Sequence, residues 1–191
     1  MPVNENSDLQ FYHNMWVGEY LRPVCDFKEE HCSIVCNHHS TWDTLDRKTR
    51  CFARELKAYY KDTEFFIKLD DDAFVDYQYV MGLMEKYRGY DKPVYISDFI
   101  LNIDWSSQVL NNTWYGNGKF YMFNRKLVDC MNPEILYDGH RNEDAVFGSM
   151  VHDGCGKVEQ VREDDSKIWH REYRNKNKYI DLTAIKNYRK E

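Results

Sequence analysis

The chain has 191 residues, which is enough for one domain with a buried core and short for two. Its formal net charge of −6 argues against nucleic acid as a partner, because binding to phosphate backbones depends on clustered Lys and Arg. No apolar run approaches the roughly 20 residues of a membrane-spanning helix, so we expect no membrane segment in this chain.

Periodicity and turn residues predict an alternation of strands and helices, which is typical of a single α/β domain. In chain order we first expect a strand over Leu9–Val17, a helix opened by Asp43 with Asp46 as its capping partner, and a strand over 65–69. A helix capped by Asp76 should follow, run to about Tyr87 and stop at Gly89, before a strand over 94–100 and a turn-rich loop over 111–118. The last expected elements are a strand over 119–123, a short helix capped by Asn124 that runs to Met131, and a helix from Glu143 to about Gly154.

A short apolar strand, 65–69, is followed directly by three carboxylates, Asp70, Asp71 and Asp72. Such a run suits the centre of a parallel sheet. Adjacent carboxylates repel one another and lose hydration at the end of a buried strand, and a divalent cation compensates for both effects. A solvated acidic turn is the alternative, but the apolar residues 73–75 that follow place the carboxylates inside a hydrophobic frame.

Six cysteines, an even number, permit up to three disulfides, and the Asn111-Asn112-Thr113 sequon permits N-glycosylation. Both features would suit a secretory lumen. We expect at least one disulfide within a group of four cysteines, Cys25, Cys32, Cys36 and Cys51.

A structural zinc site is the rival interpretation of this region, because three histidines lie near Cys32 and Cys36. These are His31, His38 and His39. The histidines follow the cysteine pair too closely to form a separate knuckle, so disulfides or buried thiols are favoured over zinc.

Residues 66–76, FIKLDDDAFVD, resemble the metal-binding segment of the β-1,3-galactosyltransferases and their relatives, which include the fringe enzymes. Three more blocks follow in the order that this family has. Residues 115–123, YGNGKFYMF, resemble its Y-C-S-G-x-G-Y-V-L-S block, with glycine and asparagine in place of Cys and Ser. Residues 142–148, NEDAVFG, resemble its E-D-V-x-x-G block, and residues 168–170, IWH, resemble the segment that carries its third metal ligand.

The resemblance covers about 9–170 and implies a single domain over 1–191 with the glycosyltransferase-A fold. That fold has a mixed, mostly parallel central sheet flanked by helices. Nothing before Leu9 matches the family's first strand and helix, so the resemblance implies a domain that lacks them. Residues 171–191 are expected to form a polar and basic tail.

The implied reaction is the Mn²⁺-dependent transfer of galactose or an N-acetylhexosamine from a UDP-sugar to a glycan hydroxyl, with inversion and formation of a β-1,3 linkage. The acceptor would be a glycan or glycoprotein, in the Golgi lumen or outside the cell. The membrane anchor usual in the family does not occur in this sequence, which indicates a fragment, a shortened relative or a protein secreted by other means.

By the same resemblance, Asp72 and His170 would hold Mn²⁺, with Asp70 assisting through water or the ribose and Asp71 in support. Hard oxygen ligands and one imidazole suit this ion. The residues implied in binding the UDP-sugar are Asp70, Asp71, Lys68, Gly116 and Gly118.

Asp144 is the candidate general base and would take the proton of the acceptor hydroxyl, while Glu143 would orient the acceptor or the base. Both acids lie in the first turn of a predicted helix, where simple N-terminal capping is the competing interpretation.

Two other classes of function stay open. A catalytically inactive, truncated relative that acts as a glycan- or partner-binding module follows if the missing first strand abolishes UDP binding. A calcium-binding structural protein could use residues 70–72, although these acids lack the regular spacing of an EF-hand loop.

Overall fold

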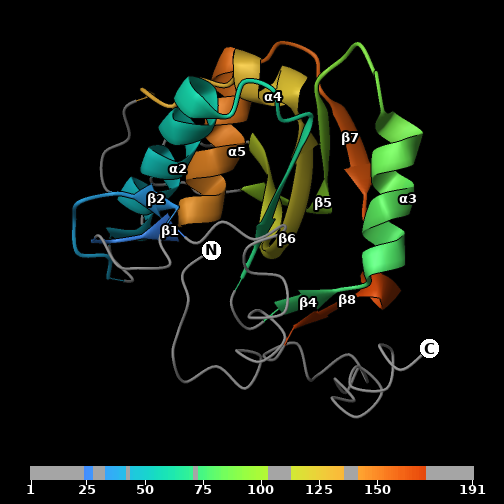
Figure 1. Cartoon of the computed structure of the whole chain (residues 1–191), viewed down its shortest axis with the longest axis horizontal. Helices are drawn as coiled ribbons and strands as arrows, with labels where there is room; N and C mark the ends of the chain where they lie inside the picture. The colour runs from blue at the N-terminus through green and yellow to red at the C-terminus, as the bar shows by residue number, and fades with distance from the viewer. Residues whose placement is uncertain are drawn as a thin grey trace.

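The computed structural model describes residues 24–27, 33–41, 44–70, 73–102, 113–135 and 142–170. Its elements in chain order are β1 (Val24–Cys25), β2 (Ile34–Val35), α2 (Leu45–Tyr59), β3 (Phe65–Leu69), β4 (Ala73–Val75), α3 (Tyr77–Tyr87), β5 (Val94–Asn102), β6 (Thr113–Asn124), α4 (Arg125–Cys130), α5 (Glu143–Gly154), β7 (Glu159–Arg162), the 3₁₀ turn η2 (Asp165–Lys167) and β8 (Ile168–His170). Figure 1 shows their arrangement.

The main sheet has four described strands in the order β3-β6-β5-β7. Strand β6 runs antiparallel to both β3 and β5, and only β5 and β7 are parallel. The expectation of a mostly parallel sheet with β3 at its centre is therefore wrong for the described residues, where β3 lies at one edge. An apolar run indicates burial on both faces of a strand, which helices on both sides provide here, and it carries no information on direction.

Two buried clusters make the domain a three-layer α/β/α sandwich (Figure 1). On one face of the sheet, helices α2, α4 and α5 pack against alternate residues of the strands, among them Phe66, Tyr121 and Phe123. On the other face, α3 packs against the intervening residues, including Phe120 and Met122. The mixed α/β class expected from the sequence is confirmed at this level.

Two of the predicted helix caps are confirmed. Asp76 accepts a hydrogen bond from the amide of Tyr79 at the start of α3, and Asn124 accepts one from Leu127 at the start of α4. The helix expected at Asp43 begins instead at Leu45, with Thr44 at the N-cap and no side-chain capping bond. Asp43 itself lies outside the described residues.

Strand β6 begins at Thr113, so the predicted loop over 111–118 is wrong from this residue onward. Gly116 and Gly118 belong to this long strand, whose register against β5 shifts between Ser97 and Phe99. The two strands pair on both sides of this irregularity, so the ladder continues from Tyr95 to Asn102 of β5. The strand predicted over 9–17, the sequon asparagines and the tail from 171 lie outside the described residues.

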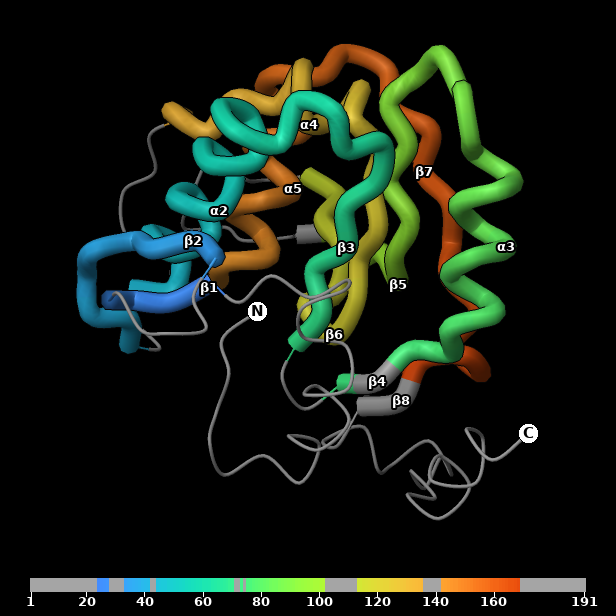
Figure 2. Tube along the Cα trace, viewed as in Figure 1, coloured from blue at the N-terminus to red at the C-terminus, as the bar shows by residue number. Residues whose placement is uncertain are grey.

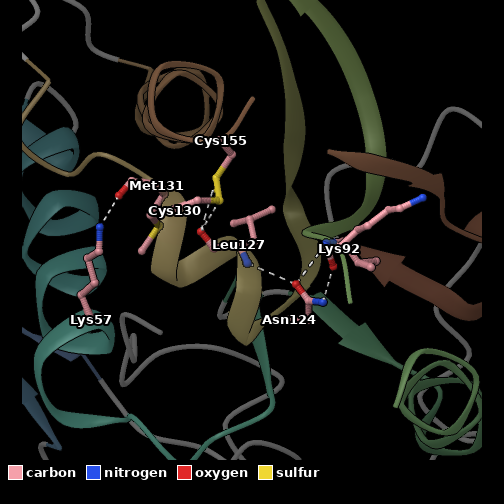
Figure 3. The surroundings of a disulfide bond; sticks show 8 residues. Lys57, Lys92, Asn124, Leu127, Cys130, Met131 and Cys155 are labelled. Atoms are coloured by element: carbon pink, nitrogen blue, oxygen red, sulfur yellow. Dashed lines mark hydrogen bonds between the residues drawn. A yellow bond between two sulfur atoms is a disulfide. The ribbon is translucent and has the colours of Figure 1, made fainter. Parts of the chain in front are cut away.

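Disulfides Cys36–Cys51 and Cys130–Cys155 are present. The first lies within the predicted cysteine group and confirms that expectation. It also occupies the Cys36 thiol, which contradicts the zinc interpretation for this residue. The second joins the end of α4 to the residue after α5, next to the carbonyl of Leu127 (Figure 3).

Disulfides are typical of secreted or lumenal proteins. Among the described helices, none is both long and apolar enough to cross a membrane.

Candidate functional site

The candidate site lies where β3 ends, beside the glycines of β6 and the first turn of α5. The amide of Asp70, the first residue after β3, donates to the carbonyl of Lys119 at 3.3 Å. This bond extends the β3–β6 ladder by one step, because Leu69 pairs with Phe120. Figure 1 shows that the short strands β4 and β8 lie beyond this end of the main sheet, and Figure 2 traces β3 beside β6.

Asn142 determines how α5 begins. Its side-chain oxygen accepts hydrogen bonds from the amides of Asp144 and Ala145, at 3.1 and 3.2 Å, and its side-chain nitrogen donates to the hydroxyl of Tyr115 at 3.3 Å. The cap of α5 is thus provided by Asn142 and is tied to β6. Simple capping does not account for the carboxylate of Asp144.

The carboxylate of Asp144 lies directly against Gly118 of β6. A Cβ atom built on Gly118 would collide with the Asp144 carboxylate, with the carboxyl carbon only 2.9 Å away. The absence of a side chain at Gly118 therefore permits this close approach.

Lys68 contacts all three elements that meet at the site: the end of β3, strand β6 and the first turn of α5. Its ammonium pairs with the carboxylate of Asp70, donates to the Gly118 carbonyl at 2.7 Å and lies 3.5 Å from Asp144 Oδ1. Burial alone would lower the pKa of Lys68, but the charges of Asp144 and Asp70 outweigh burial and raise it. The lysine consequently stays protonated between the two carboxylates.

Burial raises the pKa of Asp144 from its ordinary value of 3.8 to about 7. The positive charge of Lys68 opposes this shift, while the negative charges of Glu143 and Asp70 add to it. Oδ1 of Asp144 is buried and has no hydrogen-bond partner among the described residues, since the Lys68 contact is an ion pair at 3.5 Å. Asp144 is therefore a carboxylate that accepts a proton near neutral pH.

A buried tyrosine, Tyr121, lies next to Lys68, and the sequence-based prediction of the site did not include it. The Lys68 ammonium lies 5.4 Å from the centre of the Tyr121 ring, which stacks on Phe147 of α5 at 4.8 Å. The Tyr121 hydroxyl is buried with no hydrogen-bond partner in the described part of the chain. Alternation along β6 could have identified Tyr121, because a tyrosine on the apolar face of a strand carries a hydroxyl into the core.

The structure brings together some of the predicted site residues and not others. Lys68, Asp70, Gly118 and Asp144 come together, as described above. Gly116 lies two residues earlier on β6, where its amide donates to the Tyr95 hydroxyl at 3.0 Å.

Glu143 precedes Asp144 in the first turn of α5 and is partly exposed.

The proposed metal ligands are placed in part. Asp71 and Asp72 lie outside the described residues. Strand β8 ends at His170, whose backbone pairs with Ala73, the residue that follows Asp72 in the sequence. The amide of Ala73 donates to the carbonyl of Asp70 at 3.1 Å, so the backbone brings the end of β3 and the end of β8 to one edge.

The ligand set implied by the sequence resemblance is one that a divalent cation prefers. Carboxylate oxygens with one imidazole suit Mn²⁺. Within the described residues there is no group of three or more side chains of the metal-ligating kind, and two of the four implied ligand positions are not among those residues. The residues that would hold the ion are Asp70, Asp72 and His170.

Comparison with known proteins returned no matching family model and no curated protein with a significant match. The function is therefore argued from the geometry of the site and from the sequence blocks that meet in it.

Proposed function

We propose that this chain is an inverting, Mn²⁺-dependent glycosyltransferase that moves galactose or an N-acetylhexosamine from a UDP-sugar to a glycan hydroxyl, forming a β-1,3 linkage. The fold proposed with it is the glycosyltransferase-A fold, and the proposed compartment is the Golgi lumen. The single observation that carries the proposal is the Asp144 carboxylate, which is buried against Gly118 and has a pKa of about 7.

A general base acts best when its pKa lies near the working pH, because it must be ionised and still accept a proton readily. Asp144 meets this condition through burial, and Lys68 keeps the shift from going further. Since Asn142 already caps α5, capping does not explain the charge of Asp144, whose ion-pair partner is Lys68.

In the proposed reaction the acceptor oxygen attacks the anomeric carbon from the face opposite the diphosphate. The proton of that hydroxyl passes to Asp144, and Glu143 orients the acceptor or the base. The bond from the anomeric carbon to the diphosphate oxygen breaks, and its electron pair leaves with UDP.

In the proposed reaction, the negative charge of the departing diphosphate also needs a positive partner. Bound Mn²⁺ would supply positive charge to the diphosphate, a contribution of several kcal/mol in such sites. Asp72 and His170 would hold the ion, with Asp70 assisting and Asp71 in support. The Lys68–Asp70 ion pair fixes the direction of the Asp70 side chain toward β6.

The variant Asp144→Asn tests the assignment of the base. It keeps the size of the side chain and leaves the Asn142 cap intact, so the variant should fold and bind UDP and Mn²⁺ as the parent does. Transfer should fall at least about a hundredfold, as expected for loss of a general base. Asp153→Asn is the matched control, because Asp153 lies on the same helix and is exposed.

Equal transfer by Asp144→Asn and the parent would refute the base assignment. An inactive parent with every donor would favour the alternative, a truncated, catalytically inactive relative that acts as a glycan- or partner-binding module.

A further inference from the structure

A second, separate ion cluster is centred on Lys119. Its ammonium lies 2.7 Å from Glu163 Oε1 and 2.8 Å from Asp165 Oδ1. The side chains of Lys119 and Glu163 are 5% and 1% exposed, whereas that of Asp165 is 45% exposed. An ion pair buried to this degree costs desolvation energy, so it calls for a physical explanation.

The backbone of Lys119 belongs to the candidate site. Its carbonyl accepts the hydrogen bond from the amide of Asp70 at 3.3 Å. Lys119 also directly follows Gly118, which contacts Asp144. The main chain of this residue therefore fixes the end of β3, from which the acidic triplet starts.

The side chain of Lys119 contacts the segment that leads to His170. Asp165 begins the turn η2, and β8 follows immediately. Strand β8 has three residues and pairs with β4, which is also three residues long. A two-stranded ladder of this length is weak by itself, so its position depends on the contacts of η2.

Backbone contacts of residues 163–167, which include η2, reach β5 and the N-cap of α3. Glu163 donates its amide to the Ser97 carbonyl at 3.1 Å, and Asp76 donates its amide to the Lys167 carbonyl at 2.9 Å. The Lys119 ammonium adds the link to β6. Burial alone would lower the pKa of Lys119, but Asp165 and Glu163 raise it, so the group stays charged.

We propose that Lys119 is a positioning residue that aligns the two halves of the divalent-metal site, holding the Asp70 side through its carbonyl and the His170 side through its ammonium. This inference rests on the proposed function, because the metal site itself is part of that proposal. Lys119 touches neither metal nor substrate in this account.

The test removes the ionic link without leaving a buried charge. Replacing only one partner of a buried pair exposes the other to an uncompensated desolvation cost. The double variant Lys119→Met with Glu163→Gln neutralises both buried groups at similar volume, while half-exposed Asp165 stays solvated. Asp165→Asn is a milder variant that breaks one arm only, and Lys119→Arg keeps the charge.

Two measurements are made on each variant of the full chain. Mn²⁺ titration followed by electron paramagnetic resonance gives the metal Kd, and hydrogen exchange gives the protection of the β4–β8 amides relative to the β5–β6 amides. We expect the double variant to bind Mn²⁺ at least about tenfold more weakly, which corresponds to about 1.4 kcal/mol. Its β4–β8 amides should exchange faster, and Asp165→Asn should show a smaller change. Lys119→Arg should retain most of the Mn²⁺ affinity and most of the protection of the β4–β8 amides.

An unchanged Kd with unchanged β4–β8 exchange in both the double variant and Asp165→Asn would overturn the inference. If the parent binds no Mn²⁺, the metal site fails as a proposal. Without a metal site Lys119 has no site to align, and the exchange measurement then decides only whether its ion pairs hold β8 in place: selectively faster β4–β8 exchange supports that link and uniform exchange contradicts it. If the double variant does not fold, Asp165→Asn alone decides by the same two measurements.

Discussion

The Lys68 ammonium lies 3.5 Å from Asp144 Oδ1 while it also pairs with the carboxylate of Asp70. One lysine thus links the residue that follows β3 to the first turn of α5, two segments more than 70 positions apart in the sequence. The pKa of Asp144 depends on this contact, since Lys68 opposes the rise that burial causes.

Asp144 should make folding stability fall as the pH rises from about 4 to about 7. Its folded pKa of about 7 lies above the ordinary value of 3.8, so in this window the folded state binds more protons than the unfolded state. Below the window Asp144 is protonated in both states, and above it the full cost of the buried charge is present. The measurement is the free energy of unfolding in urea at pH 4.5 and pH 7.5.

Other groups also titrate in this range, so the parent is compared with Asp144→Asn. The variant should gain stability relative to the parent at the higher pH and less at the lower pH. Lys68→Met should steepen the dependence, because removing the positive charge raises the pKa of Asp144 further. A difference between parent and Asp144→Asn that is constant with pH would contradict the shifted pKa.

Gly118→Ala should impair the site while leaving the fold in place. The new methyl group would displace the Asp144 carboxylate, which a flexible side chain can accommodate without unfolding. We expect transfer to fall at least about tenfold, since misplacing a catalytic group by about 1 Å can cost about a hundredfold. The control is Gly156→Ala, because a Cβ at Gly156 meets no atom within 4 Å. Similar activity in both variants would refute the close contact.

Loss of the Cys130–Cys155 disulfide should destabilise the protein. The bridge closes a loop with a sequence separation of 25, and loop entropy of this size corresponds to about 3–4 kcal/mol. The Cys130→Ser/Cys155→Ser variant should therefore melt about 6–16 °C lower. Melting is followed by circular dichroism under non-reducing conditions, with Cys36→Ser/Cys51→Ser for comparison. A melting temperature unchanged by removal of Cys130–Cys155 would indicate that the bridge does not form.

Local signals predicted much of the fold. The caps at Asp76 and Asn124 and the helix that begins at Glu143 follow from short-range chemistry, because each needs one side chain and the first turn of its own helix. The edge position and antiparallel partner of β3 could not be predicted in this way. They depend on contacts with β6, which begins more than 40 residues later.

Contacts between residues far apart in the sequence also limited the prediction of the site. The sequence blocks identified Lys68, Asp70, Gly118 and Asp144, which the fold brings together, but nothing in the blocks indicated that Lys68 joins the two carboxylates. The ion cluster of Lys119 with Glu163 and Asp165 was also missed. Lys119 lies more than 40 residues before Glu163 and Asp165 in the sequence, and no spacing marks the lysine as their partner.

The most direct test of the proposed function is release of UDP from UDP-sugars by the purified chain. The donors are UDP-galactose, UDP-N-acetylglucosamine and UDP-N-acetylgalactosamine, each measured with Mn²⁺, with EDTA, and with Mn²⁺ restored after EDTA. We predict that at least one donor releases UDP, that EDTA abolishes release, that Mn²⁺ restores it, and that Asp72→Ala removes it. No release from any donor in Mn²⁺, with or without a panel of glycan acceptors, would contradict the account.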